Sequence, residues 1–219
     1  MSKKNSPYFW QAIWFWLQTP LVYRIFRKFT DRGMQEMFVK KHLRPKIGMK
    51  ILDIGCGTAD VLTILPKVQY VGFDINQRYI RTAKKNYRGG GVFLVRKIEQ
   101  MNKAPYGPYD LVLAKGLIHH LPDAAALHLL QFAHDALRVG GQLVTLDGVL
   151  TPKQGFWARY FVSHDRGRHV RTLSAYRALF RHLFPKTAFF VYDDLLRFPY
   201  TLLVTESRKT IASAKKRKI

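Results

Sequence analysis

The sequence predicts an α/β fold with a doubly wound, seven-stranded and mostly parallel sheet. From Lys50 onward, short apolar runs end at turn residues and alternate with stretches that can form crossover helices. The first run leads into a glycine-rich loop, and the last two are separated only by residues 193–199, which predicts an antiparallel final pair. The runs are Ile51–Ile54, Tyr70–Phe73, Val92–Val95, Leu111–Ala114, Leu143–Leu146, Ala188–Tyr192 and Tyr200–Val204.

Residues 1–43 are expected to form a helical extension before a main domain at 44–206 and a basic tail at 207–219. Within residues 8–43, apolar side chains recur at helical spacing, as at Trp10, Ile13, Trp14 and Leu17, and basic side chains lie beside them. Such helices can lie at a membrane surface or cover the sheet as a lid, and the pattern allows both. No run has the roughly 18 apolar residues that span a bilayer.

The charge balance is strongly basic, with 37 Lys and Arg against 14 Asp and Glu and a formal net charge of +23. Such a surface attracts nucleic acid, anionic lipid or acidic substrates, but it carries no information about the fold. The single cysteine, Cys56, cannot form an internal disulfide or a cysteine-rich metal site. We therefore expect a cytoplasmic protein without a bound metal, which can associate with the inner membrane surface.

The loop after the first run contains the strongest local signal. The segment from Asp53 to Thr58 reads Asp-Ile-Gly-Cys-Gly-Thr, and glycines there let the backbone approach a ligand at a helix start. Asp60 stands where a dinucleotide fingerprint has its third glycine, which argues against NAD or FAD. Asp74 ends the next strand, about 20 residues after the loop, where a carboxylate can accept hydrogen bonds from ribose hydroxyls. A nucleoside-containing ligand is predicted.

These motifs resemble the class I S-adenosylmethionine-dependent methyltransferases, of the small-molecule, UbiE-like type, over residues 44–206. The resemblance extends to residues 109–121, similar to the fourth strand and its turn, and to residues 137–143, similar to the turn before the fifth strand. It implies a Rossmann-like fold and S-adenosylmethionine as cofactor. By this match, the methionine part would contact Asp53, Gly55, Cys56 and Gly57, and the ribose would contact Asp74. The remaining cofactor positions that it implies are Ile75, Lys97, Ile98 and Lys115.

Two positions depart from the family pattern. Ala59 replaces a glycine that many members have, a change that is tolerated if the backbone there keeps a negative φ. Lys97 aligns where an aspartate often contacts the adenine amino group, and a lysine cannot accept that hydrogen bond. Glu99, a backbone carbonyl or stacking would then hold the adenine.

Two histidines follow the fourth strand, at the edge of the expected cofactor pocket. A neutral imidazole at His119 could take a proton from a hydroxyl or amine acceptor, with His120 beside the substrate. The alternative, which the residues alone favour, is that both histidines pack within the turn.

Arginines form a second cluster after the fifth strand, in a loop expected above the carboxyl ends of the strands. Guanidinium groups suit phosphate or carboxylate. A solvated basic loop is an equally good interpretation. The candidate substrate residues are Tyr23, His120, Arg166, Arg168, Arg171 and Arg197.

Three functions follow from these observations. The first is methyl transfer to a small-molecule or lipid-like acceptor, which could be anionic. The second is RNA methylation, suggested by the +23 charge, although no RNA-binding module is recognisable. The third is a non-catalytic subunit that binds the cofactor and stabilises a partner. The sequence does not identify the methylated atom.

Overall fold

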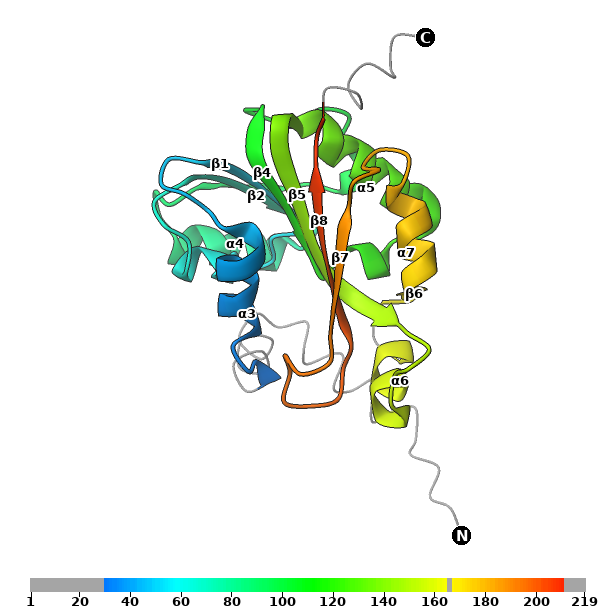
Figure 1. Cartoon of the computed structure of the whole chain (residues 1–219). Helices are drawn as coiled ribbons and strands as arrows, with labels where there is room; N and C mark the ends of the chain where they lie inside the picture. Colours follow the sequence, from blue (N-terminus) through cyan, green and yellow to red (C-terminus); the bar gives the residue numbers. More distant parts are fainter. Residues whose placement is uncertain (1–29, 165–166, 211–219) are drawn as a thin grey trace.

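The computed structural model describes residues 30–164 and 167–210, and in this part of the chain the strands form one eight-stranded sheet (Figure 1). Along the sheet the order is β3-β2-β1-β4-β5-β8-β7, and the short β6 pairs with β5. Six of the seven predicted runs lie entirely within strands, and the seventh, Tyr200–Val204, overlaps the last strand only from Leu202 onward. The predicted fold class is confirmed. The strands are β1 (Lys50–Ile54), β2 (Gln69–Asp74), β3 (Val92–Val95), β4 (Tyr109–Lys115), β5 (Leu137–Leu150), β6 (Arg171–Thr172), β7 (Ala188–Tyr192) and β8 (Leu202–Arg208).

The sheet is parallel from β3 to β5 and antiparallel from β5 to β7. The central strands are buried on both faces, which explains why they appear in the sequence as continuous apolar runs. The predicted antiparallel final pair is confirmed, with Val191 opposite Leu203. The last strand ends at Arg208, two residues beyond the expected boundary of the main domain.

Helices cover both faces of the sheet (Figure 1). On one face, α5 (Asp123–Ala136) and α7 (Leu173–Phe180) pack on a core that includes Leu52 and Ile54. On the other, α3 (Met34–Met37), the π-helix η1 (Phe38–Leu43) and α4 (Gln77–Asn86) pack on a core that includes Ile51. This division follows from side chains that alternate between the two faces of a strand. Further helices within residues 30–164 and 167–210 are η2 (Asp60–Thr63), η3 (Ile98–Gln100), η4 (Ile118–His120) and α6 (Phe156–Ser163).

The described end of the N-terminal extension lies on the sheet and is tied to the β7–β8 connection. The backbone N–H of Arg32 donates to the Leu195 carbonyl at 3.2 Å, and that of Arg197 donates to the Thr30 carbonyl at 2.8 Å. Residues 34–43 pack on one face of the sheet through Met34, Phe38, Val39 and Leu43. The role of the whole extension, as a lid or a membrane-surface element, stays a prediction. The aromatic segment from Trp10 to Leu17 lies outside the described residues.

The backbone of Ala59 does not have the negative φ under which its replacement of glycine was expected to be tolerated. Its φ is +58°, not negative, so an alanine occupies a left-handed conformation where many relatives have glycine. The left-handed conformation costs a residue with a Cβ roughly 1–2 kcal/mol. Ala59 is fully buried in the core, and its packing there offsets this cost.

Candidate functional site

The glycine loop is held against the end of β2 by its own backbone. The N–H groups of Gly55 and Cys56 both donate to the Phe73 carbonyl, at 2.8 and 3.0 Å, and the Gly57 N–H donates to Asp74 Oδ2 at 2.9 Å. Gly55 and Gly57 have φ values of +72° and +56°, which favour glycine. The buried Thr58 hydroxyl has no hydrogen-bond partner among the described residues. An orphaned buried hydroxyl beside a glycine turn fits a loop that binds a polar ligand.

Asp74 is the acidic residue that the sequence placed at the ribose. Its Oδ1 accepts the backbone N–H of Asn76 at 2.7 Å while its Oδ2 accepts that of Gly57, so it links the glycine loop to the start of α4. Burial raises the pKa of this carboxyl, and the two backbone hydrogen bonds oppose that shift. A carboxylate has about four lone-pair directions, so it can still accept two ribose hydroxyls. The adjacent Ile75 is 66% exposed and offers an apolar surface to a base.

Asp53 and Cys56 support the loop from below. Asp53 Oδ2 accepts the hydroxyl of Tyr70 at 2.6 Å, and Asp53 itself is buried. A Cβ on Gly72 would lie 2.9 Å from the Cys56 Sγ, so the strand passes directly under the cysteine. Burial, followed by the charges of Asp53 and Asp74, raises the pKa of the Cys56 thiol. A thiol with a raised pKa is a poor nucleophile. The expected contact of Cys56 with the cofactor stays a prediction.

The end of β3 carries Lys97 at the position where the family often has an aspartate. Lys97 is exposed and lies with its Nζ 3.7 Å from Glu99 Oε1, while the side chain of Ile98 is buried in the core. The Ile98 carbonyl already accepts His128 Nε2 and the Met101 N–H. The adenine contact stays a prediction, with Glu99, another backbone carbonyl or stacking as the alternatives.

Lys115 and the turn that follows it lie next to the glycine loop. The Lys115 Nζ donates to Gln35 Oε1 at 3.0 Å, which links the end of β4 to α3. A Cβ on Gly55 would lie 3.1 Å from Leu117 Cδ2, so this leucine packs against the glycine loop. The turn that carries His119 therefore adjoins the loop expected to hold the cofactor.

His119 is paired with a buried carboxylate that the sequence had not indicated. Its Nδ1 lies 2.7 Å from Asp147 Oδ1, and the same oxygen accepts the His119 backbone N–H at 3.1 Å. Asp147 is almost fully buried, and its Oδ2 has no partner among the described residues. Because Asp147 lies inside an apolar strand 28 residues away, only the pairing of β4 with β5 brings it to His119.

Arg171 has a different role from the one predicted for it. Its guanidinium donates to Asp123 Oδ1 and to the carbonyls of Ile118, Leu121 and His169, at distances from 2.6 to 3.0 Å. All five N–H groups are thus used. Arg171 fixes the turn on both sides of His119, and this arrangement disagrees with its expected contact with the substrate.

Residues 167–169, in the loop that contains the predicted arginines, lie against the His119 turn. Gly167 is buried, and a Cβ there would lie 2.1 Å from His119 Cδ2, while the His169 N–H donates to the His119 carbonyl at 3.0 Å. Arg168 and His120 are exposed beside it, and the His119 and His120 rings are 4.2 Å apart. The predictions for Tyr23 and Arg166 fall outside the described residues.

Arg197 lies at a hollow of about 680 Å³ with Asp31, Arg32 and Gly33. The sequence missed Arg32, because only the pairing of residues 30–32 with 195–197 brings it there.

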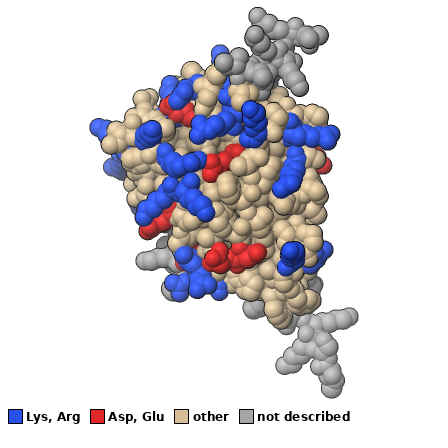
Figure 2. All heavy atoms as spheres, viewed as in Figure 1, with Lys and Arg blue, Asp and Glu red and all other residues tan. Residues whose placement is uncertain are grey.

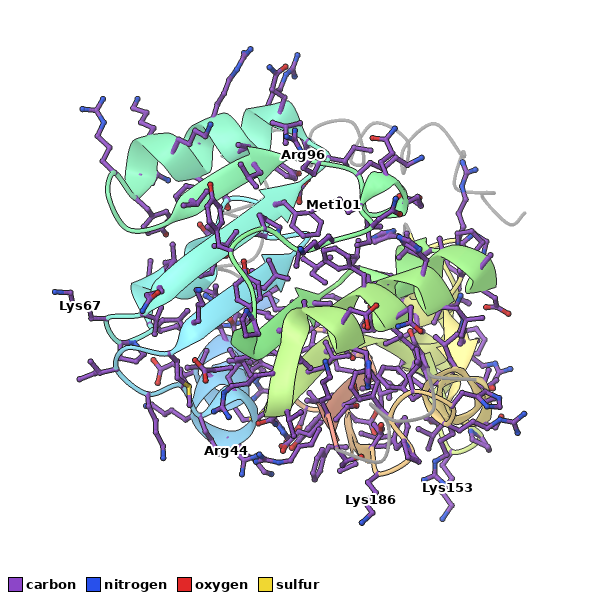
Figure 3. The ribbon with its side chains drawn as sticks, turned by 90° about the horizontal axis from the view of Figure 1, so that it is seen from above. Arg44, Lys67, Arg96, Met101, Lys153 and Lys186 are labelled. Atoms are coloured by element: carbon purple, nitrogen blue, oxygen red, sulfur yellow. The ribbon has the colours of Figure 1, made fainter. Side chains whose placement is uncertain are left out.

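A separate hollow of about 770 Å³ at the amino ends of β1 and β2 includes Lys67, which lies on the side of the molecule away from Lys153 (Figure 3). That second hollow is remote from Asp74 and His119 and plays no part in the site. The described residues contain no group of three or more His, Cys, Asp or Glu side chains placed to hold a metal.

Comparisons with known proteins agree with this geometry. The chain matches a family described as a methyltransferase domain over residues 45–176, more than half of its length. It is 29% identical over 141 residues to the ribosomal protein L11 methyltransferase of Thermosipho africanus, covering 62% of this chain and 51% of that protein. It is also 29% identical over 101 residues to the ubiquinone biosynthesis O-methyltransferase of Pseudomonas aeruginosa, covering 44% and 43%. The chain thus spans about half the length of these relatives.

Among solved structures, human N-acetylserotonin methyltransferase in complex with SAM superimposes with a TM-score of 0.57 at 18% identity. The match covers 73% of this chain and 47% of that one, and at this identity it shows the fold alone. The matched range includes the glycine loop, Asp74 and His119. The chain therefore belongs to the class I S-adenosylmethionine-dependent methyltransferases.

Proposed function

We propose that this protein transfers a methyl group from S-adenosylmethionine to a small-molecule or lipid-like acceptor, with His119 as the general base. The observation that carries the proposal is the pair formed by His119 and the buried Asp147, next to the glycine loop. A carboxylate on Nδ1 fixes the tautomer of the ring and stabilises the imidazolium that forms when Nε2 takes a proton.

The chemistry requires little else from the protein. When bound, the cofactor supplies a methyl group on a positively charged sulfur. Transfer would form a bond between the acceptor atom and that carbon and would leave the carbon–sulfur electron pair on sulfur. His119 would take the acceptor's proton. Asp74 and the glycine loop position the donor, and the turn held by Arg171 positions the base.

Basic groups near the site favour an anionic acceptor. Arg32 and Arg197 border one hollow, and Arg168 is exposed in the loop over His119. Guanidinium groups bind carboxylate or phosphate through paired hydrogen bonds. The relative from ubiquinone biosynthesis supports a small-molecule acceptor by its name alone.

Association with the cytoplasmic face of a membrane forms part of the proposal. None of the helices in residues 30–164 and 167–210 combines the length and hydropathy needed to cross a bilayer. Lys and Arg are spread over the surface with few acidic groups between them, as the face in Figure 2 shows. Such a surface is attracted to anionic headgroups.

The relatives named as L11 methyltransferases favour a second candidate, a protein acceptor. One experiment separates the candidates: incubate the chain with S-adenosylmethionine labelled in its methyl group and fractionated lysate, then follow the label into lipid, polar metabolites, RNA and protein. We expect it in lipid or metabolites, and label confined to protein or RNA would contradict the proposal. Cofactor binding without transfer to any fraction would favour a non-catalytic subunit.

A further inference from the structure

Two large aromatic side chains stand exposed on α6. Phe156 is 75% exposed and Trp157 61% exposed, and their ring centroids lie 5.3 Å apart. Tyr160 continues the same surface, with its ring centroid 6.2 Å from that of Trp157. Isolated exposed apolar residues are common, but adjacent aromatic rings on one helical turn indicate an interaction surface.

The opposite side of α6 is anchored in the protein. Val162 is fully buried, and the Phe161 ring packs against Phe198 with 5.6 Å between centroids. Just before the helix, the Gln154 side chain donates to the Thr201 hydroxyl at 2.7 Å and to the Val149 carbonyl at 3.3 Å. The exposed rings are therefore presented by a fixed helix.

The helix lies at the carboxyl edge of the sheet, where the candidate site is. It follows β5, the strand that carries Asp147, and lies beyond the end of that strand in Figure 1. If α6 contacts a surface that holds a hydrophobic acceptor, the acceptor would thus reach the protein at the carboxyl edge of the sheet, where His119 lies.

The charged residues around α6 indicate which kind of surface this helix contacts. Among the described residues from 151 to 170 there are three basic side chains and no acidic one. Lys153, Arg159 and Arg168 are exposed, and Lys153 projects away from the body of the protein in Figure 3. Aromatic rings beside Lys and Arg are the composition of elements that lie in the interface of an anionic bilayer.

We propose that α6 is a membrane-docking element that inserts Phe156 and Trp157 among the headgroups of an anionic bilayer. Lys153, Arg159 and Arg168 then face the phosphates. The inference deepens the proposed function, because it names the surface from which a lipid-like acceptor would enter; the binding itself does not require methyl transfer.

Flotation of the full chain with phosphatidylcholine vesicles, with and without phosphatidylglycerol, tests this directly. We expect binding that needs phosphatidylglycerol and weakens with salt, and that falls about tenfold in a Phe156→Ser, Trp157→Ser double variant. The matched control is Ile47→Ser, because Ile47 is 79% exposed before β1, at the other edge of the sheet, and its loss should leave binding unchanged. Equal binding by the double variant would overturn the proposal.

The fluorescence of Trp157 provides a second test of the proposal. Replacing Trp10, Trp14 and Trp16 with Phe leaves Trp157 as the only tryptophan. Its emission should shift to the blue on phosphatidylglycerol vesicles and be quenched by brominated acyl chains. No shift would overturn the proposal, and so would a change of oligomeric state in the double variant, since a second copy would then cover α6. Calorimetric binding of S-adenosylmethionine to the double variant should be unchanged, which separates this test from that of the methyltransferase activity.

Discussion

The Nδ1 atom of His119 lies 2.7 Å from Oδ1 of Asp147, a carboxylate that is almost fully buried beneath the turn after β4. Because the same oxygen also accepts the His119 backbone N–H, Asp147 fixes both the ring and the turn that carries it. In the proposed function, this contact would orient the His119 ring and stabilise its charged form as it takes a proton.

Asp147→Asn should lower kcat about a hundredfold, because the amide cannot stabilise an imidazolium and can select the wrong tautomer. The affinity for S-adenosylmethionine should not change. The measurement is turnover with the acceptor fraction, against pH, beside calorimetry of cofactor binding. An unchanged kcat and pH profile would show that the pair is only structural.

Gly167→Ala should reduce turnover about tenfold or more, because the added Cβ would lie 2.1 Å from His119 Cδ2 and must displace the ring. Gly155→Ala is the matched control, since a Cβ there meets nothing within 4 Å. Initial rates for both variants, with circular dichroism to verify folding, test this. If the two variants behave alike, the loop does not position His119.

Arg171→Met should destabilise the protein by about 3 kcal/mol, because the Ile118 and Leu121 carbonyls lose their charged donor. Urea unfolding at neutral pH measures this. Arg168→Met, at an exposed position, should change the free energy of unfolding by no more than about 0.5 kcal/mol. Equal stabilities would contradict the positioning role of Arg171.

The affinity for S-adenosylmethionine should fall on acidification before an ordinary aspartate would protonate. Burial raises the pKa of Asp74 above its usual 3.8, and only the carboxylate accepts two ribose hydroxyls. Protonation on lowering the pH therefore weakens binding, and Asp74→Asn should bind weakly with a flatter pH dependence. Calorimetry between neutral and mildly acidic pH tests this, and an equally steep loss in the variant would assign the effect to another group.

Local patterns predicted the sheet and the glycine loop because both depend on neighbouring residues. The run from Ile51 to Ile54 and the acid at Asp74 are readable at fixed spacing. Asp147, Arg32 and the role of Arg171 could not be read this way, because each depends on contacts between distant segments. The positive φ of Ala59 could not be read from the sequence either, because it accompanies burial in the core that the local sequence does not reveal.

The most direct test is calorimetric titration of the full chain with S-adenosylmethionine, comparing Asp74→Ala with Asp135→Ala, an exposed carboxylate on α5. We predict one cofactor per chain, binding weakened at least about tenfold by Asp74→Ala through the lost ribose hydrogen bonds, and no change with Asp135→Ala. Undiminished binding by the Asp74→Ala variant, or no binding by the unmodified chain, would contradict the assignment of the glycine loop as the methyl-donor site.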